Sequence, residues 1–191
     1  MRPYPALVAL AALLWVTACA SFTSRPSRPD YAGPGRALPV RLNVTERGMQ
    51  EQGDGRWADR PGNGELAHSA TQAIVASGWI DEHRYDESSP LLDVRISNYQ
   101  SDGPNFASVI TACLVPGMLD NRITIDAALA PPRGEVLKCS REIDVRTWFQ
   151  TFLIVLYPVF SPRAARAEST DALALQCVAE LLKQSASTAA P

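Results

Sequence analysis

The side chains that could bind a metal gather in one acidic segment, DEHRYDESSP, at residues 81–90. One histidine there, His83, has three carboxylates within three positions of it: Asp81, Glu82 and Asp86. Imidazole and carboxylate groups are zinc ligands. Ligands packed so closely along an exposed loop are nevertheless more typical of solvated charges. The sequence therefore predicts no metal site in this segment.

The candidate nucleophiles lack the partners that would activate them. His68 and Ser69 are adjacent on a predicted helix, where neighbouring side chains diverge, so they do not form a dyad. Cys113 lies among apolar residues, which reduce the reactivity of a thiol. The sequence contains no G-x-S-x-G, H-E-x-x-H, Walker A or G-x-G-x-x-G motif. We therefore expect no enzymatic activity.

Cys19 stands directly behind the apolar start of the chain. Arg2 is the only charged residue among the first twenty-four, and every residue from 6 to 16 is apolar. This run is too short to span a bilayer, which takes roughly 20 residues. A short apolar run behind a positive N-terminus is typical of a secretory signal peptide. Ordinary cleavage after Ala18-Cys19-Ala20 would discard Cys19.

The residues Val16-Thr17-Ala18-Cys19 resemble the lipobox of bacterial lipoproteins, with residues 1–18 as the signal peptide. This resemblance implies a diacylglycerol on the Cys19 thiol, cleavage before Cys19 and an acyl chain such as palmitate on its amine. Two or more acyl chains anchor a protein stably to a membrane. Lipoproteins with an aspartate after the cysteine usually stay at the inner membrane. Ala20 and Ser21 therefore imply the outer membrane, facing the periplasm.

The residues after the signal peptide are enough for a single folded domain. Loss of Arg2 changes the formal net charge from −2 to −3, which gives no reason to expect nucleic-acid binding. An oxidising periplasm permits a disulfide. Cys139 and Cys177 both lie on apolar faces and are the favoured pair. The alternative is that Cys113, Cys139 and Cys177 are three buried thiols.

The first half of the chain predicts a linker and a strand–helix–strand unit. Residues 19–36 are rich in Ser, Pro, Gly and Arg, which predicts a flexible linker after the lipidated cysteine. Apolar residues alternate over 38–45 and again over 92–99, which predicts two strands. Between them, residues 46–63 are typical of a long loop, and 66–77 have a helical apolar stripe that ends at Gly78.

The second half predicts a hairpin and a closing helix. Residues 123–129 and 137–145 alternate around the turn at 131–134, and residues 169–184 form an amphipathic helix. We expect one α+β domain over residues 37–185, followed by a disordered tail at 186–191. Its fold would be an antiparallel sheet of about four to five strands, with two helices packed on one face. This layout resembles that of small uncharacterised Gram-negative envelope lipoproteins.

Two apolar stretches, 106–118 and 148–160, flank the hairpin and should lie near each other at its open end. Short apolar runs are most often buried strands or core helices, and that interpretation is favoured. The alternative is an exposed apolar contact surface, which soluble proteins rarely tolerate without a partner. The residues that would form such a surface are Val115, Trp148, Phe149, Phe152, Leu156 and Phe160.

The sequence therefore favours a non-catalytic binding or assembly module of the envelope, held to the membrane by its lipid anchor. Its expected partner is another envelope protein. An alternative is a carrier or accessory subunit that shelters a lipid or another apolar ligand. Beyond the acyl chains on Cys19 we expect no cofactor, and we expect no nucleic-acid partner.

Overall fold

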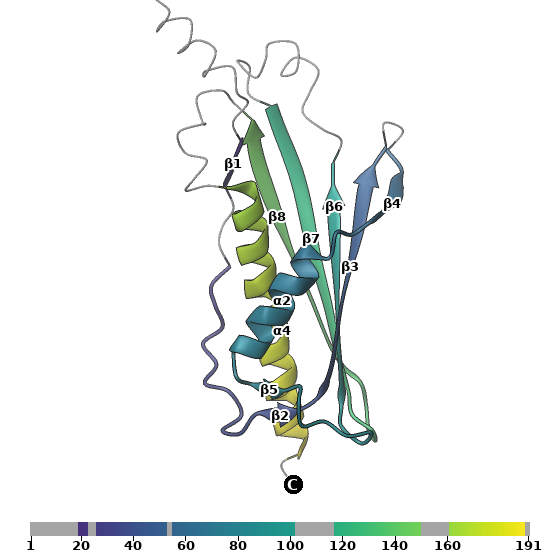
Figure 1. The fold of residues 1–191 in the computed structure, drawn as a ribbon, viewed down its shortest axis with the longest axis vertical. Helices are drawn as coiled ribbons and strands as arrows, with labels where there is room; N and C mark the ends of the chain where they lie inside the picture. The colour runs from purple at the N-terminus through teal and green to yellow at the C-terminus, as the bar shows by residue number, and fades with distance from the viewer. Residues whose placement is uncertain (1–18, 23–25, 53–54, 102–116, 150–160, 190–191) are drawn as a thin grey trace, which may run out of the picture.

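A computed structural model describes residues 19–22, 26–52, 55–101, 117–149 and 161–189 (Figure 1). Its elements, in chain order, are β1 (Cys19–Phe22), β2 (Leu38–Pro39), β3 (Arg41–Glu51), β4 (Trp57–Pro61), α2 (Glu65–Ala76), β5 (Ile80–Asp81), β6 (Leu91–Gln100), β7 (Gly117–Ala130), β8 (Leu137–Phe149) and α4 (Pro162–Ala189). Six strands form one sheet in the order β1-β8-β7-β6-β3-β4, and β2 pairs with β5 in a small parallel sheet.

The large sheet has one apolar face, because apolar and polar side chains alternate along its strands. On β7, Ile123, Ile125 and Leu129 are buried, whereas Arg122 and Asp126, on the other face of the strand, are exposed. Both helices lie across the apolar face: α4 contacts β7 and β8, and α2 contacts β3 (Figure 1). The predicted α+β class, with two helices on one face of a largely antiparallel sheet, is confirmed.

The sheet has six strands rather than four to five, and one of its pairs is parallel. β3 and β6 run in the same direction, whereas the other neighbours in this sheet are antiparallel. Parallel neighbours need a crossover connection, and α2 belongs to the connection between β3 and β6. The sheet is therefore mostly antiparallel, as expected, and this pair is its parallel exception.

The loop expected over residues 46–63 is instead largely a hairpin. β3 continues to Glu51 and β4 pairs back along it, with Gly48 opposite Arg60. A Cβ on Gly48 would lie 2.9 Å from the carbonyl oxygen of Arg60, so this approach requires glycine. Glu46 and Gly48 follow Val44 at helix-facing positions. A charge and a glycine there end the apolar alternation, so the sequence pattern is that of a loop.

The closing helix is longer than expected at both ends. α4 begins at Pro162 instead of residue 169, and proline suits the first turn of a helix, where its missing N–H would have no partner. The helix continues to Ala189, through most of the segment expected as a disordered tail. Its buried side chains include Ala174, Val178 and Leu181, which pack in the same core as Ile74 of α2.

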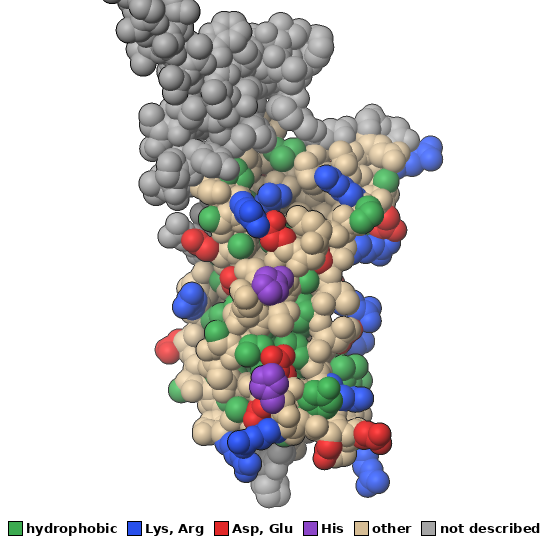
Figure 2. All heavy atoms as spheres, in the orientation of Figure 1, with side chains coloured by type: hydrophobic (Ala, Val, Ile, Leu, Met, Phe, Trp, Pro, Cys, Tyr) green, Lys and Arg blue, Asp and Glu red, His purple; other side chains and the backbone are tan. Residues whose placement is uncertain are grey.

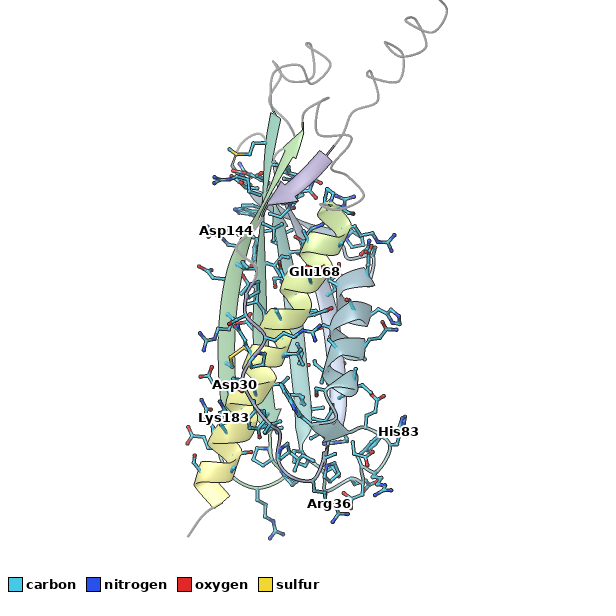
Figure 3. The ribbon with its side chains drawn as sticks, turned by 90° about the vertical axis from the view of Figure 1, so that its left-hand side faces the viewer. Asp30, Arg36, His83, Asp144, Glu168 and Lys183 are labelled. Atoms are coloured by element: carbon cyan, nitrogen blue, oxygen red, sulfur yellow. A yellow bond between two sulfur atoms is a disulfide. The ribbon has the colours of Figure 1, made fainter. Side chains whose placement is uncertain are left out.

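The described part of residues 19–36 differs from the expected flexible linker. β1 pairs with β8 at the edge of the large sheet, from Cys19 opposite Phe149 to Phe22 opposite Arg146. Further along, the ring of Tyr31 packs edge-on against Trp79, with centroids 5.1 Å apart. Gln176 of α4 donates a hydrogen bond to a backbone carbonyl of the same segment, at Ser27. Asp30, also in this segment, lies beside α4 in Figure 3.

Candidate functional site

In the acidic segment, Asp81 and Asp86 accept hydrogen bonds from residues two positions further along the chain. The backbone N–H of His83 donates to Asp81 Oδ1 at 3.1 Å, and Asp81 also pairs with Arg84. Hydrogen bonds from Ser88 and Ser89 lower the pKa of Asp86. The His83 side chain is 86% exposed and points away from the body of the molecule (Figure 3). Within the described part of the chain, no three His, Cys, Asp or Glu residues are placed to hold a metal ion.

His68 and Ser69 point in different directions, as their adjacency on a helix predicts. His68 is exposed on α2. Both histidines are visible on the helix-bearing face in Figure 2. Ser69 Oγ instead donates to Asp171 Oδ2 on α4, at 3.0 Å. Burial is the main cause that raises the pKa of Asp171. This contact joins the two helices.

A disulfide joins β8 to α4. Its cysteines are Cys139 and Cys177, whose Cα atoms are 5.5 Å apart, and both lie in the core. These are the two residues whose apolar positions made them the favoured pair in the sequence. Cys113 lies outside the described residues.

Three chain segments come together at one end of the large sheet. β1, β8 and β7 are neighbours in that order, and Phe149 of β8 pairs with both Cys19 and Gly117. Gly117 belongs to the apolar stretch 106–118, and Phe149 belongs to 148–160. The described ends of the two stretches are thus adjacent, as the hairpin predicts. We call this end of the sheet the Cys19 end.

The structure does not describe the side chains of the predicted contact surface. Trp148 and Phe149 are described only as backbone, in the last two positions of β8. The other four residues, Val115, Phe152, Leu156 and Phe160, lie outside the described residues. Among the residues that are described, no helix combines the length and the apolar character needed to cross a membrane.

An apolar cavity lies at the opposite end of the sheet. It has a volume of about 560 Å³ and lies between the C-terminal part of α4 and the turn that joins β7 to β8. Leu129 and Leu137 line it from the hairpin, and Leu182 lines it from α4. β7 is fourteen residues long, so this cavity is roughly 40 Å from the Cys19 end.

A polar cavity of about 240 Å³ lies towards the Cys19 end, on the helix-bearing side. Its charged lining residues are Glu46, Arg60 and Arg166, and Asn98 reaches it from β6. No sequence pattern indicates this site, because Arg60 lies in a segment expected as a loop and Arg166 precedes the predicted helix. Only the parallel pairing of β3 with β6 brings these residues together, and no local motif indicates that pairing.

Comparisons with known proteins identify no family for the chain. No protein-family model matches it, and no curated protein matches it in sequence. One similar solved structure is the rare lipoprotein B from Shewanella oneidensis, at 15% identity and a TM-score of 0.39, covering 78% of this chain and 95% of the other. A candidate lipoprotein from Caulobacter crescentus CB15 has 14% identity and a TM-score of 0.35, covering 80% of this chain and 93% of its own.

Proposed function

We propose that this chain is an outer-membrane lipoprotein that faces the periplasm and binds another envelope protein without catalysing a reaction. The lipobox-like residues Val16–Cys19 support acylation of Cys19, and Ala20 with Ser21 support the outer membrane. Acyl chains on Cys19 would hold the folded domain at the bilayer.

The observation that carries the proposal is the placement of Cys19 next to the described ends of both apolar stretches. Phe149 pairs with Cys19 on one side and Gly117 on the other. An anchor at this position would bring both stretches to the membrane surface. We propose that residues 106–118 and 148–160 form the contact surface, with Val115, Trp148, Phe149, Phe152, Leu156 and Phe160 as its apolar side chains.

The use of the described acid–base groups supports a non-catalytic role. Asp81 and Asp86 accept backbone hydrogen bonds within turns, and Asp171 joins α4 to α2 by accepting a hydrogen bond from Ser69. Glu46 accepts hydrogen bonds from the first turn of α2. Each of these carboxylates has a structural contact that accounts for its position.

Metabolic labelling tests the anchor and its membrane. Cells grown with an alkyne analogue of palmitate should label the wild-type protein, and Cys19→Ala should abolish the label. Ala20→Asp should keep the label but move the protein from outer-membrane to inner-membrane fractions on a density gradient. An unlabelled wild-type protein would overturn the proposed anchoring, and an unmoved Ala20→Asp variant would overturn the proposed sorting.

Photocrosslinking from two matched positions tests the contact end. Met118 lies at the Cys19 end and is 40% exposed, whereas Val136 lies at the opposite end and is 43% exposed. A photoreactive amino acid at 118 should capture one defined envelope protein in living cells. The same amino acid at 136 should not. Equal capture from both positions would contradict a contact surface at the Cys19 end.

The apolar cavity between α4 and the β7–β8 turn favours a second candidate function, that of a carrier. Its volume of about 560 Å³ is within the usual range of ligand pockets. A carrier purified in mild detergent should retain a lipid detectable by native mass spectrometry. Leu182→Gln, which places an amide in the cavity wall, should release that lipid. Retention of the lipid by this variant would exclude the cavity as its site.

A further inference from the structure

The polar cavity near the Cys19 end contains two guanidinium groups that lack a carboxylate partner. Within the described segments, Arg166 reaches only the carbonyl oxygen of Pro162, at 3.4 Å, and Arg60 on β4 forms no ion pair. Arg163, one turn before Arg166, differs because it pairs with Glu65. Figure 2 shows Lys and Arg side chains spread along the helix-bearing face, including its upper part.

The carboxylate of Glu46, the acidic residue of this cavity, contacts the start of α2. Its Oε2 atom accepts hydrogen bonds from the backbone N–H groups of Leu66 and Ala67, at 2.9 and 3.3 Å. These groups belong to the first turn of α2, where the positive end of the helix dipole stabilises a carboxylate. The cavity therefore has a net positive charge available to a ligand, supplied by Arg60 and Arg166.

Asn98 adds a polar atom that needs a partner. Its Oδ1 atom is buried and has no hydrogen-bond partner among the described residues, and Asn98 lines the cavity. A buried acceptor without a donor costs free energy, so such atoms usually face a water or a ligand group. A ligand for this cavity should therefore have a hydrogen-bond donor close to its anionic group.

Glycines leave the cavity open on the side of the β3–β4 hairpin. Gly48 and Gly62 line it. A Cβ on Gly62 would come within 3.0 Å of Glu46, so a side chain there would displace the helix-capping carboxylate. The volume of about 240 Å³ corresponds to roughly eight water molecules. That space accommodates a phosphate group with a few attached atoms.

We propose that this cavity binds the headgroup of an anionic phospholipid. Arg60 and Arg166 donate to the phosphate oxygens, the geometry for which guanidinium groups are best suited. Asn98 Oδ1 accepts from a headgroup hydroxyl. Gln100, which also lines the cavity, pairs with Asn121, four positions along β7 from Gly117. The cavity is thus roughly 13 Å along the sheet from the Cys19 end.

This inference rests on the proposed function in one respect: anchoring at Cys19 is what would bring the cavity to the bilayer surface. A bound headgroup would then add a second attachment that fixes how the domain stands on the membrane. The binding itself does not depend on the anchor and can be measured separately from it.

The test is calorimetric titration of the full-length, detergent-solubilised protein with dihexanoylphosphatidylglycerol. Arg60→Gln and Arg166→Gln should each weaken binding roughly tenfold, because each removes charge-assisted hydrogen bonds to phosphate. Arg146→Gln is the matched control: it removes the same charge near the same end, on the opposite face of the sheet, where Arg146 pairs with Asp120. It should leave the affinity unchanged.

Two further titrations identify what is recognised. Dihexanoylglycerol, which lacks the phosphate, should not bind. Inorganic phosphate should bind more weakly than the phospholipid, and Asn98→Ala should weaken only the phospholipid. The proposal is overturned if dihexanoylglycerol binds equally, if phosphate alone binds as tightly, or if the two arginine variants match the wild type. Failure of Cys19 labelling would overturn the proposed anchor and leave these affinities unaffected.

Discussion

At the scale of single residues, the start of α2 depends on a carboxylate from another element. Gly64 occupies the N-cap position and provides no side-chain hydrogen bond. Glu46 of β3 replaces that cap by accepting from the N–H groups of Leu66 and Ala67. This one side chain therefore joins α2 to β3 and provides an acceptor for two backbone N–H groups in the first turn of α2.

Glu46→Ala should destabilise the protein by about 1–2 kcal/mol, because it removes a helix cap and leaves two N–H groups without a partner. Glu46→Gln keeps an acceptor and should recover part of this loss. Glu142→Ala, at an exposed position on β8, should have little effect. Urea unfolding measures all three. A Glu46→Ala variant as stable as the wild type would show that solvent can replace this cap.

Asp171 makes the stability of the helix pair dependent on pH. Burial raises its pKa, so the folded state binds this proton more tightly than the unfolded state does. Its contribution to the free energy of unfolding therefore falls as the pH rises from the unfolded pKa through the higher folded pKa. Above the folded pKa, the cost of the buried charge is fully present.

Asp171→Asn removes this cost and keeps an acceptor for Ser69. The variant should be more stable than the wild type at pH 7.5, and the difference should shrink towards zero as the pH falls to 4. Thermal unfolding at several pH values measures the difference. A variant that is destabilised equally at every pH would show that the hydrogen bond to Ser69 matters more than the charge.

At the scale of elements, periodicity predicts those parts of the fold whose apolar positions are filled by apolar residues. The β7–β8 hairpin and the middle of α4 satisfy this condition, and both were predicted. The C-terminal half of β3 does not satisfy it, because Glu46 and Gly48 occupy helix-facing positions there. Their roles, a helix cap and a close backbone approach, involve residues 66 and 60, and nothing local indicates either contact.

The candidate sites differ in whether a local sequence motif marks their residues. Cys19 ends a lipobox-like run of four residues, so the sequence alone is enough to propose it as a lipidation site. Arg60, Asn98 and Arg166 come from β4, β6 and α4, and they meet only because β3 and β6 are parallel neighbours. A site that depends on strand order has no signal in a single sequence.

The disulfide between β8 and α4 should be an important constraint on the fold. It joins residues 38 positions apart. Closing a loop of that length stabilises a protein by about 4 kcal/mol in the chain-entropy model, and measured values are usually 2–4 kcal/mol. The double variant Cys139→Ala/Cys177→Ala should lose stability within that range in urea unfolding. A reducing agent should destabilise the wild type and have no further effect on the double variant.

At the scale of the whole molecule, Cys19 and the domain are joined more closely than the linker-like composition of residues 19–36 predicts. Cys19 is itself paired with Phe149, so acyl chains on it would attach directly to the end of the sheet. A flexible tether would let the domain tumble beside the membrane. If Cys19 is acylated as proposed, a paired β1 would instead turn the Cys19 end towards the bilayer and the β7–β8 turn away from it.

Two fluorescent positions test this orientation. A fluorescent amino acid at Met118 should be strongly quenched by headgroup-attached quenchers when the lipidated protein is in vesicles, because position 118 lies one residue from Gly117, which pairs with Phe149. The same amino acid at Val136 should be quenched weakly, since fourteen residues of β7 place it roughly 40 Å further away.

Disrupting β1 with Ser21→Pro should make the two signals more alike, because a proline lacks the N–H that a paired strand donates. Equal quenching in the unaltered protein would mean that β1 does not fix the orientation of the domain on the bilayer. Residues 19–36 would then act as the flexible linker that their composition predicts.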